Sequence, residues 1–310
     1  MKKILFAIVI IAIIGLGIST ASNISQKSKI NPAKLNIITT LFPLYDFAKI
    51  IGQEKVEVSL LLPPGVESHS FEPKPSDIVK INGSDIFMYT GKFMEPWAED
   101  IINGVSNKNV AFVNASKGID LIKLNDNMPD EAHGFDPHIW LDFDNNKIMI
   151  DTIRDALIKR DPTNSSFYEK NTIDYKNKLS ELDNKYKSTL KKCKNREIVY
   201  GGHYAFGYLA KRYNLKYLAA QGLAPDSEPT ANGLVKLIEQ VKKNNIKYIF
   251  YEEMATTKIA ETIANETNAK MLLLNAIHNV TKEDVENNVS FFSIMEENLV
   301  NLKTGLQCYK

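Results

Sequence analysis

The sequence lacks two features that would each point to a definite class of protein. Lys and Arg number 38 and Asp and Glu 37, so the chain has no basic excess with which to neutralise phosphates, and we exclude nucleic acid as a partner. No cysteine follows the apolar run at the N-terminus, so there is no acceptor for a bacterial lipid anchor. What is present is a chain of 310 residues that is 44% hydrophobic, which is enough for a sizeable core and favours two domains over one.

The N-terminus has the pattern of an export signal. Met1-Lys2-Lys3 precede an apolar run over residues 4–18 and a short polar stretch over 19–22. The apolar run is shorter than the ~18–20 residues of a membrane-spanning helix and fits the core of a signal peptide. We therefore expect residues 1–21 to be a signal peptide, or a membrane anchor if they stay uncut. Residues 22–34 would be a flexible lead-in to a protein that works outside the cytoplasm.

Only two cysteines occur, Cys193 and Cys308. An even count in an exported chain favours a disulfide between them, which would fasten the C-terminus to the start of the second half of the chain. Two free thiols are the alternative.

Runs rich in β-branched and aromatic residues alternate with helix-like segments, a pattern typical of parallel sheets covered by helices. Four such runs fall in each half of the chain, at residues 35–40, 56–62, 85–90 and 110–115, and at 197–202, 215–220, 247–252 and 270–275. The sequence thus predicts an α/β fold of two lobes, each with a four-stranded, mainly parallel sheet flanked by helices.

One long amphipathic helix is predicted between the halves. Its apolar stripe consists of Tyr175, Leu179, Leu182, Tyr186 and Leu190, at spacings of three or four residues. A helix over residues 164–192 would be roughly 40 Å long, enough to run the height of both lobes. We expect it to join an N-terminal lobe (35–163) to a C-terminal lobe (193–310), with a cleft between them.

Four of the five histidines fall in predicted loops, three of them after strands. His69 and His138 belong to the first lobe and His203 and His278 to the second, while His133 lies in a polar loop. A single loop histidine is more often a hydrogen-bonded structural residue than a ligand. Four at the rim of one cleft, two from each lobe, indicate a shared metal site, and neutral imidazoles suit Zn²⁺, Cu²⁺ and Ni²⁺.

Several carboxylates lie near these histidines, and a metal-bound imidazole commonly donates its second N–H to such a group. They are Glu67, Glu72 and Asp77 around His69, Asp136, Asp142 and Asp144 around His138, and Glu228, Glu252 and Glu253 in the second lobe. One of those in the first lobe could be such a partner, although we expect Asp77 and Asp144 to cap the helices that follow them. For the glutamates of the second lobe we expect local hydrogen bonds, with contact to a metal-bound imidazole as the alternative.

Taken together, six segments resemble one known family. The chain is similar, over essentially its whole mature length, to the zinc/manganese class of solute-binding proteins of ABC transporters. The segments are PPGVESHSFEPKPSD, DPHIWLD, GGHYAFGYLAKRYNL, GLAPDSEPT, YEEMATTKIAETIANET and FFSIMEENLVNLKTGLQC. The resemblance implies two α/β lobes joined by a backbone helix, one metal ion in the cleft, and transfer of that metal to a permease driven by a separate ATPase.

The resemblance also implies a ligand set. His69, His138 and His203 match the family's three histidine ligands. Many relatives have an acidic fourth ligand where this chain has LNAIHNVT, so His278, Asn275 or a water could complete the site, and we favour His278. An all-imidazole site favours Zn²⁺ over Mn²⁺, because carboxylates serve Mn²⁺ better. His133 stands where zinc-specific relatives carry a longer histidine-rich insertion, and an auxiliary role in metal capture is a further hypothesis.

The leading hypothesis is a monomeric extracytoplasmic carrier that binds Zn²⁺ and delivers it to an ABC permease with its ATPase. It would be associated with the membrane through that permease or through an uncut N-terminus. A Mn²⁺ carrier and a metal-dependent adhesin of the same fold are alternatives.

An exported zinc hydrolase is a further alternative, of a different class. Such an enzyme needs three ligands, an open position for water and a base, for which Glu67 or Glu72 could serve. The sequence has no HExxH or similar pair of ligands on one helix. Ligands that come singly from distant loops suit binding and release, so we predict that the protein is not an enzyme.

Overall fold

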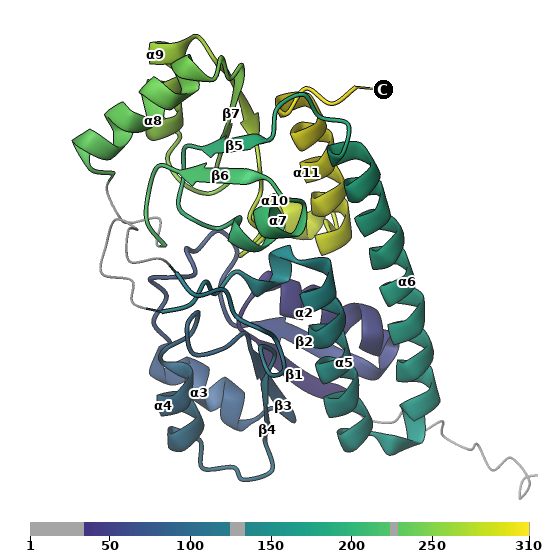
Figure 1. Ribbon diagram of the computed structural model, residues 1–310. Helices are drawn as coiled ribbons and strands as arrows, with labels where there is room; N and C mark the ends of the chain where they lie inside the picture. The colour runs from purple at the N-terminus through teal and green to yellow at the C-terminus, as the bar shows by residue number, and fades with distance from the viewer. Residues whose placement is uncertain (1–33, 125–133, 224–228, 310) are drawn as a thin grey trace, which may run out of the picture. The chain divides into compact units, whose positions relative to one another are not determined.

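The computed structural model describes residues 34–124, 134–223 and 229–309, and these contain two parallel four-stranded sheets (Figure 1). The first sheet has the order β2-β1-β3-β4 and the second β6-β5-β7-β8, and every pairing is parallel. The strands are β1 (Leu35–Thr39), β2 (Val56–Leu60), β3 (Ile86–Tyr89), β4 (Ala111–Asn114), β5 (Glu197–Tyr200), β6 (Lys216–Ala219), β7 (Tyr248–Tyr251) and β8 (Lys270–Leu273). All eight predicted runs therefore form strands, and the two-lobed α/β fold is confirmed.

The central strands of each sheet are buried on both faces, which explains why they are largely apolar runs, whereas the edge strand β2 (VEVSL) alternates between apolar and exposed polar residues. In β1, Ile37 belongs to a large core that continues into the second lobe, whereas Ile38 belongs to a smaller cluster on the opposite face. In β5, Tyr200 lies in the large core and Val199 in a separate outer cluster. One apolar core thus connects the lobes, and each lobe has a smaller core of its own on the outer side.

The helices cover these faces in two groups. The large core is lined by α2 (Phe42–Gly52), α5 (Phe143–Arg160), α6 (Ser165–Leu190), α7 (Gly207–Arg212) and α11 (Phe291–Gly305). The outer faces are covered by α3 (Pro75–Asn82) and α4 (Ala98–Gly104) in the first lobe and by α8 (Ala231–Lys243) and α9 (Lys258–Thr267) in the second. A short helix, α10 (Lys282–Glu286), follows the last strand.

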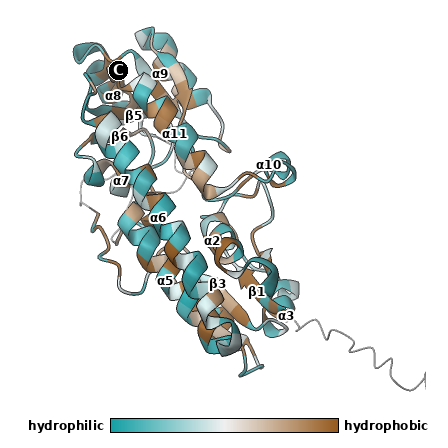
Figure 2. Ribbon diagram, turned by 90° about the vertical axis from the view of Figure 1, so that its right-hand side faces the viewer, coloured by the Kyte–Doolittle hydropathy of each residue, from teal (hydrophilic) through white to brown (hydrophobic). Residues whose placement is uncertain are grey.

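The predicted linking helix is α6, which has 26 residues and is therefore about 39 Å long. It begins just after the turn at Pro162–Asn164 and ends at Leu190. All five residues of the predicted apolar stripe are buried, and hydrophilic and hydrophobic residues alternate along the helix in Figure 2. Because α6 packs on α2 and α5 of the first lobe and on α11 of the second, it contacts both (Figure 1). The lobe limits at residues 163 and 193 remain predictions.

The predicted disulfide is present, and it joins Cys193, just after α6, to Cys308, just after α11. It fastens the C-terminal end of the chain to the base of the second sheet. No helix among the described residues is long and apolar enough to cross a membrane. The predicted signal peptide and most of the lead-in, residues 1–33, lie outside the described residues.

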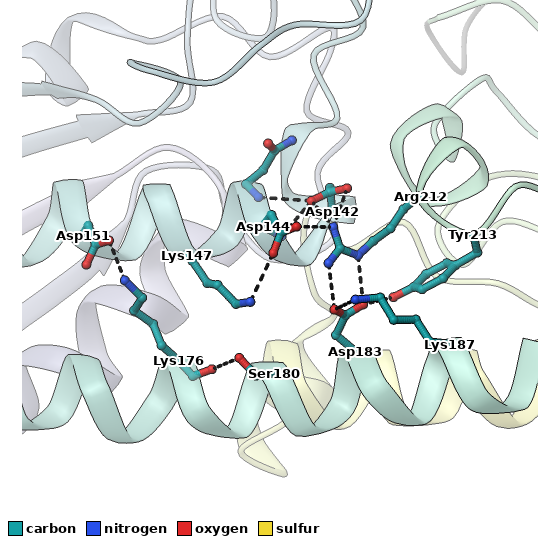
Figure 3. Close-up of polar contacts among 11 residues, drawn as sticks. Asp142, Asp144, Lys147, Asp151, Lys176, Ser180, Asp183, Lys187, Arg212 and Tyr213 are labelled. Carbon is teal, nitrogen blue, oxygen red and sulfur yellow. Dashed lines mark hydrogen bonds and ion pairs between the residues drawn. The ribbon is translucent and has the colours of Figure 1, made fainter.

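A buried arginine joins the two lobes and α6, as Figure 3 shows. Arg212 of α7 forms a bidentate pair with Asp183 of α6, with N–O distances of 2.9 and 2.7 Å. Its other nitrogen, Nη1, donates to Asp142 at 3.0 Å and to Asp144 at 2.8 Å, both at the start of α5. The prediction that Asp144 caps α5 is therefore wrong. Asp142 is the cap, accepting from the backbone N–H of Asp144 and Asn145, because its extended backbone points its carboxylate at the free amides of the first turn.

Candidate metal centre

The structure brings together the four histidines that the sequence analysis singled out. One ligand nitrogen from each of His69, His138, His203 and His278 lies within 4.8 Å of the other three. His138, His203 and His278 are buried, and His69 is partly exposed. These residues come from four loops at the carboxyl ends of strands, where α/β sheets place their ligands. A cluster of this kind could hold a metal ion.

The arrangement of the rings is close to a regular tetrahedron. All six distances between ring centroids fall between 5.0 and 5.3 Å, and six equal edges define a tetrahedron. The Nε2 atom of His138 lies 3.3 Å from Nε2 of His69 and 3.3 Å from Nε2 of His203. Tetrahedral zinc with Zn–N bonds of ~2.0–2.1 Å has neighbouring nitrogens about 3.3–3.4 Å apart. The cluster therefore has the dimensions of a tetrahedral zinc site.

The loops that carry His69 and His278 are tied to each other across the two lobes. Asn279 donates its side-chain N–H groups to the carbonyls of Pro63 and Val66, at 2.7 and 2.9 Å. Gly65 N–H donates to the carbonyl of Val280 at 2.9 Å. Prolines and glycine keep the first of these loops irregular and limit the entropy lost in fixing it. The two histidines are thus held near each other by backbone contacts that do not involve their rings.

The residue before His278 adopts an unusual backbone conformation. Ile277 has φ 63°, a left-handed value that is rare for a β-branched residue. Its N–H donates to Oδ1 of Asn275 at 2.7 Å, and the N–H of Phe42 holds the carbonyl of His278 at 3.2 Å. These bonds stabilise a turn that aims His278 at the other three rings. Oδ1 of Asn275, one alternative fourth ligand, is engaged in that turn.

Two carboxylates contact the outer nitrogens of two of the rings. Asp136 Oδ1 lies 2.7 Å from Nδ1 of His138 and also accepts from the His138 backbone N–H. Glu252 Oε1 lies 2.8 Å from Nδ1 of His203, but the alignment is poor for a hydrogen bond, so its main effect there is that of a nearby charge. With Nδ1 facing a carboxylate, each ring presents Nε2 to the cluster, as metal-bound histidines commonly do.

Two glycines near His203 make room for these carboxylates. A side chain at Gly202 would collide with the carboxylate of Glu252, and one at Gly207 would collide with that of Asp136. This close approach explains why Gly202 and Gly207 are glycines, because a Cβ at either position would push a carboxylate away from its imidazole.

Burial sets the protonation of the cluster. Burial and the neighbouring imidazoles lower the pKa of His138 and His278 well below 6.5 and that of His69 to about 3. These rings are therefore neutral near pH 7, which is the form that binds metals. Burial also raises the pKa of Asp136 to about 8.

Glu67 and Glu253 differ in charge at pH 7. Burial raises the pKa of Glu67, but hydrogen bonds from the backbone of His69 and Ser70 outweigh it, and the net shift is downward. Burial and the charge of Glu252 raise the pKa of Glu253 to about 8. At pH 7 Glu67 is therefore a carboxylate and Glu253 is mostly protonated.

The other residues considered in the sequence analysis lie apart from the cluster or outside the described residues. Asp77 accepts from the backbone N–H of Lys74 and so takes part in the cap of α3, but it lies in the first turn of that helix rather than before it as predicted, and Lys74 is the N-cap residue. Glu72 is exposed. His133 and Glu228 lie outside the described residues.

One residue of the centre was not predicted. Trp140 packs edge-on against the rings of His138 and His278, with centroids 5.5 and 5.2 Å away, and its Nε1 donates to the carbonyl of Ala276 at 2.8 Å. It is fully buried. Its position two residues after His138 was visible in the sequence, but its contact with His278 depends on the docking of the two lobes.

Comparison with known proteins gives one consistent result. The family model described as "Zinc-uptake complex component A periplasmic" matches residues 37–305. The chain is 39% identical over 281 residues to the high-affinity zinc uptake system protein ZnuA of Bacillus subtilis, and the match covers 88% of each protein. It is 35% identical over 313 residues to the zinc-binding lipoprotein AdcA of Streptococcus pneumoniae, covering 98% of this chain and 61% of that protein. The chain thus spans about three-fifths of the length of AdcA.

Solved structures agree with this result. The crystal structure of the Zn(II)-bound ZnuA-like domain of Streptococcus pneumoniae AdcA matches with a TM-score of 0.77 and 36% sequence identity. The match covers 88% of this chain and 99% of that domain.

Proposed function

We propose, since this chain belongs to the family of zinc-uptake complex component A proteins, that it binds Zn²⁺ outside the cytoplasm and delivers the ion to the permease of an ABC transporter. Family members are solute-binding components of transporters, and the chain is not an enzyme. Zn²⁺ is then the cargo of the protein rather than a resident cofactor.

His69, His138, His203 and His278 are the proposed ligands. The observation that carries the proposal is the near-regular tetrahedron of their rings, with Nε2 of His138 3.3 Å from Nε2 of both His69 and His203. Four protein nitrogens would close a tetrahedral site and leave no position for a reactive water. This supports binding and release over the hydrolase alternative, for which one position must stay open.

The donor set supports zinc over manganese. All four proposed donors are imidazole nitrogens and none is a carboxylate oxygen, whereas Mn²⁺ is better served by carboxylate oxygens. Asp136 and Glu252 lie behind the rings rather than among the donors. Asp136 would accept the Nδ1–H of a metal-bound His138, and the negative charge of Glu252 would lie beside His203.

Delivery follows from the division of the ligands between the lobes. Two come from loops of the first lobe and two from loops of the second, so opening at this junction would remove half of the ligand set at once. We propose that a permease with its ATPase triggers this step, that the carrier acts as a monomer, and that its N-terminal segment directs export.

Competition between metals tests the proposed cargo. Metal-free protein titrated with Zn²⁺ against a competing chelator is expected to bind one ion per chain, at least about a thousandfold more tightly than Mn²⁺. The matched variant His278→Asp introduces a carboxylate and is expected to reduce the ratio of the Mn²⁺ and Zn²⁺ dissociation constants. Binding of Mn²⁺ as tight as that of Zn²⁺ by the unaltered protein would contradict the proposal.

A further inference from the structure

A cavity of about 230 Å³ lies beside the histidine cluster, between loops of the two lobes. It is lined by Gly65, Glu67 and Ser68 of the first lobe and by Glu252, Glu253, Met254, Ala255, Thr256 and His278 of the second. Its volume far exceeds the ~10–15 Å³ that one water needs, so a cation could enter it with part of its hydration shell. Of the four clustered histidines, only His278 lines it.

The lining of this cavity suits a cation. Three of the described residues that line it carry carboxyl groups, and none of them is Lys or Arg. The cluster itself consists of imidazoles, which attract a distant dication only weakly. Glu253 is mostly protonated at pH 7, whereas the negative charge of Glu67 raises the local concentration of cations and steers their association.

Glu67 is the carboxylate best placed to hold an ion in this cavity. Its Oε2 accepts from the N–H and hydroxyl of Ser70, at 2.8 and 3.1 Å, Oε1 lies 3.4 Å from the hydroxyl of Ser68, and the backbone of His69 also donates to this carboxylate. Both oxygens of Glu253, in contrast, face the N–H of Ala276 at 3.1–3.2 Å. Glu252 is directed at His203. Glu67 is thus the one of these three carboxyl groups whose contacts all come from its own loop, the loop that carries His69.

A second observation points to the same place. Nε2 of His278 is buried and has no hydrogen-bond partner among the described residues, although His278 lines the cavity. A buried nitrogen without a partner is costly, and a metal ion arriving from the cavity would satisfy it. The cavity thus has a carboxyl group, that of Glu67, on one lobe and, on the other, His278, whose buried Nε2 has no hydrogen-bond partner among the described residues.

We propose that this cavity is the route by which Zn²⁺ enters and leaves the histidine cluster, with Glu67 as a transit ligand that passes the ion to His278. The inference rests on the proposed function, because it concerns the same ion and the same cluster. Glu67 first replaces a water of the hydrated ion, and His278 then replaces Glu67 as the ion reaches the other three rings. Glu67 is not a ligand of the final site.

The test is the rate of zinc binding to Glu67→Gln, measured by stopped flow with Zn²⁺ alone and the fluorescence of Trp140, which packs on two of the rings. A transit ligand lowers the barrier in both directions. We therefore expect the association and dissociation rate constants both to fall by about fivefold or more, with Kd within about twofold of the unaltered protein. Glu67→Asp, which keeps the charge, is expected to recover most of the association rate.

The matched control is Glu72→Gln, which removes a carboxylate from the same loop at an exposed position outside the cavity. It is expected to leave both rates unchanged. Unaltered rates in Glu67→Gln would overturn the transit role, and so would faster dissociation with normal association, which would make Glu67 a ligand of the bound state. Failure of the unaltered protein to bind Zn²⁺ would instead refute the proposed function.

Discussion

Replacing His203 with alanine is expected to weaken zinc binding by about a hundredfold or more. Loss of the hydrogen-bond partner of a metal-bound imidazole typically lowers metal affinity ~10–100-fold, and loss of a direct ligand lowers it at least as much. His203 is fully buried and its Nε2 lies 3.3 Å from that of His138. Alanine would leave three donors and expose the ion to water at the fourth position. Competitive titration with a chelator at pH 7 measures the change in Kd.

The same substitution at His133 is the matched control, because His133 is the one histidine of the five that does not belong to the proposed ligand set. His133→Ala is expected to keep Kd within about twofold, since an auxiliary part in capture would alter rates rather than the final site. Thermal unfolding of both variants without metal checks that the fold is intact. Equal affinities in the two variants would remove His203 from the ligand set.

Replacing Arg212 with methionine is expected to lower the free energy of unfolding by about 3–5 kcal/mol. The side chains of Arg212 and Asp183 are only 9% and 4% exposed, and removal of one partner leaves a buried charge without its main counter-charge. For a protein of this size the change corresponds to a fall in Tm of roughly 6–15 °C. Because Arg212 also holds the first turn of α5 to α7, the substitution removes a joint between the lobes (Figure 3). Urea unfolding measures the effect.

Arg154→Met is the matched control. Arg154 pairs with Asp151 and Asp155 near the surface of α5, and such pairs contribute ~0–1 kcal/mol. Similar losses in the two variants would contradict the role given to Arg212.

The pH dependence of stability gives a second test of the ion pair between Arg212 and Asp183. Burial raises the pKa of Asp183, but hydrogen bonds from Arg212, Lys187 and Tyr213 outweigh it and lower the pKa to about 2. A carboxyl whose pKa is lower in the folded state contributes stability above its unfolded pKa of ~3.9 and loses it as the pH falls toward 2. The stability difference between the unaltered protein and Arg212→Met is therefore expected to shrink between about pH 4 and pH 2.

Much of the fold follows from local patterns in the sequence. Apolar runs predict the central strands because these are buried on both faces. The stripe from Tyr175 to Leu190 predicts α6 because one side of that helix is buried along both lobes. Four histidines could be assigned to one site because parallel strands bring their carboxyl ends to the same edge of a sheet.

Contacts that depend on strand order or on the docking of the lobes could not be predicted in the same way. Glu252 reaches His203 because β7 lies beside β5, although the two residues are 49 positions apart. Trp140 reaches His278, and Arg212 reaches Asp142, only after the lobes meet. The sequence does not separate Asp142, which caps α5, from Asp144, which lies in its first turn, because both are aspartates at the start of the helix and the start is fixed only by the backbone angles of Asp142.

X-ray absorption at the zinc edge of the zinc-loaded protein tests the central claim most directly. The account predicts four nitrogen neighbours with the scattering pattern of imidazole at ~2.0–2.1 Å, and no oxygen from water or carboxylate in the inner shell. An inner shell of three imidazoles and one oxygen would contradict it, because the ion would then not be held by all four clustered histidines.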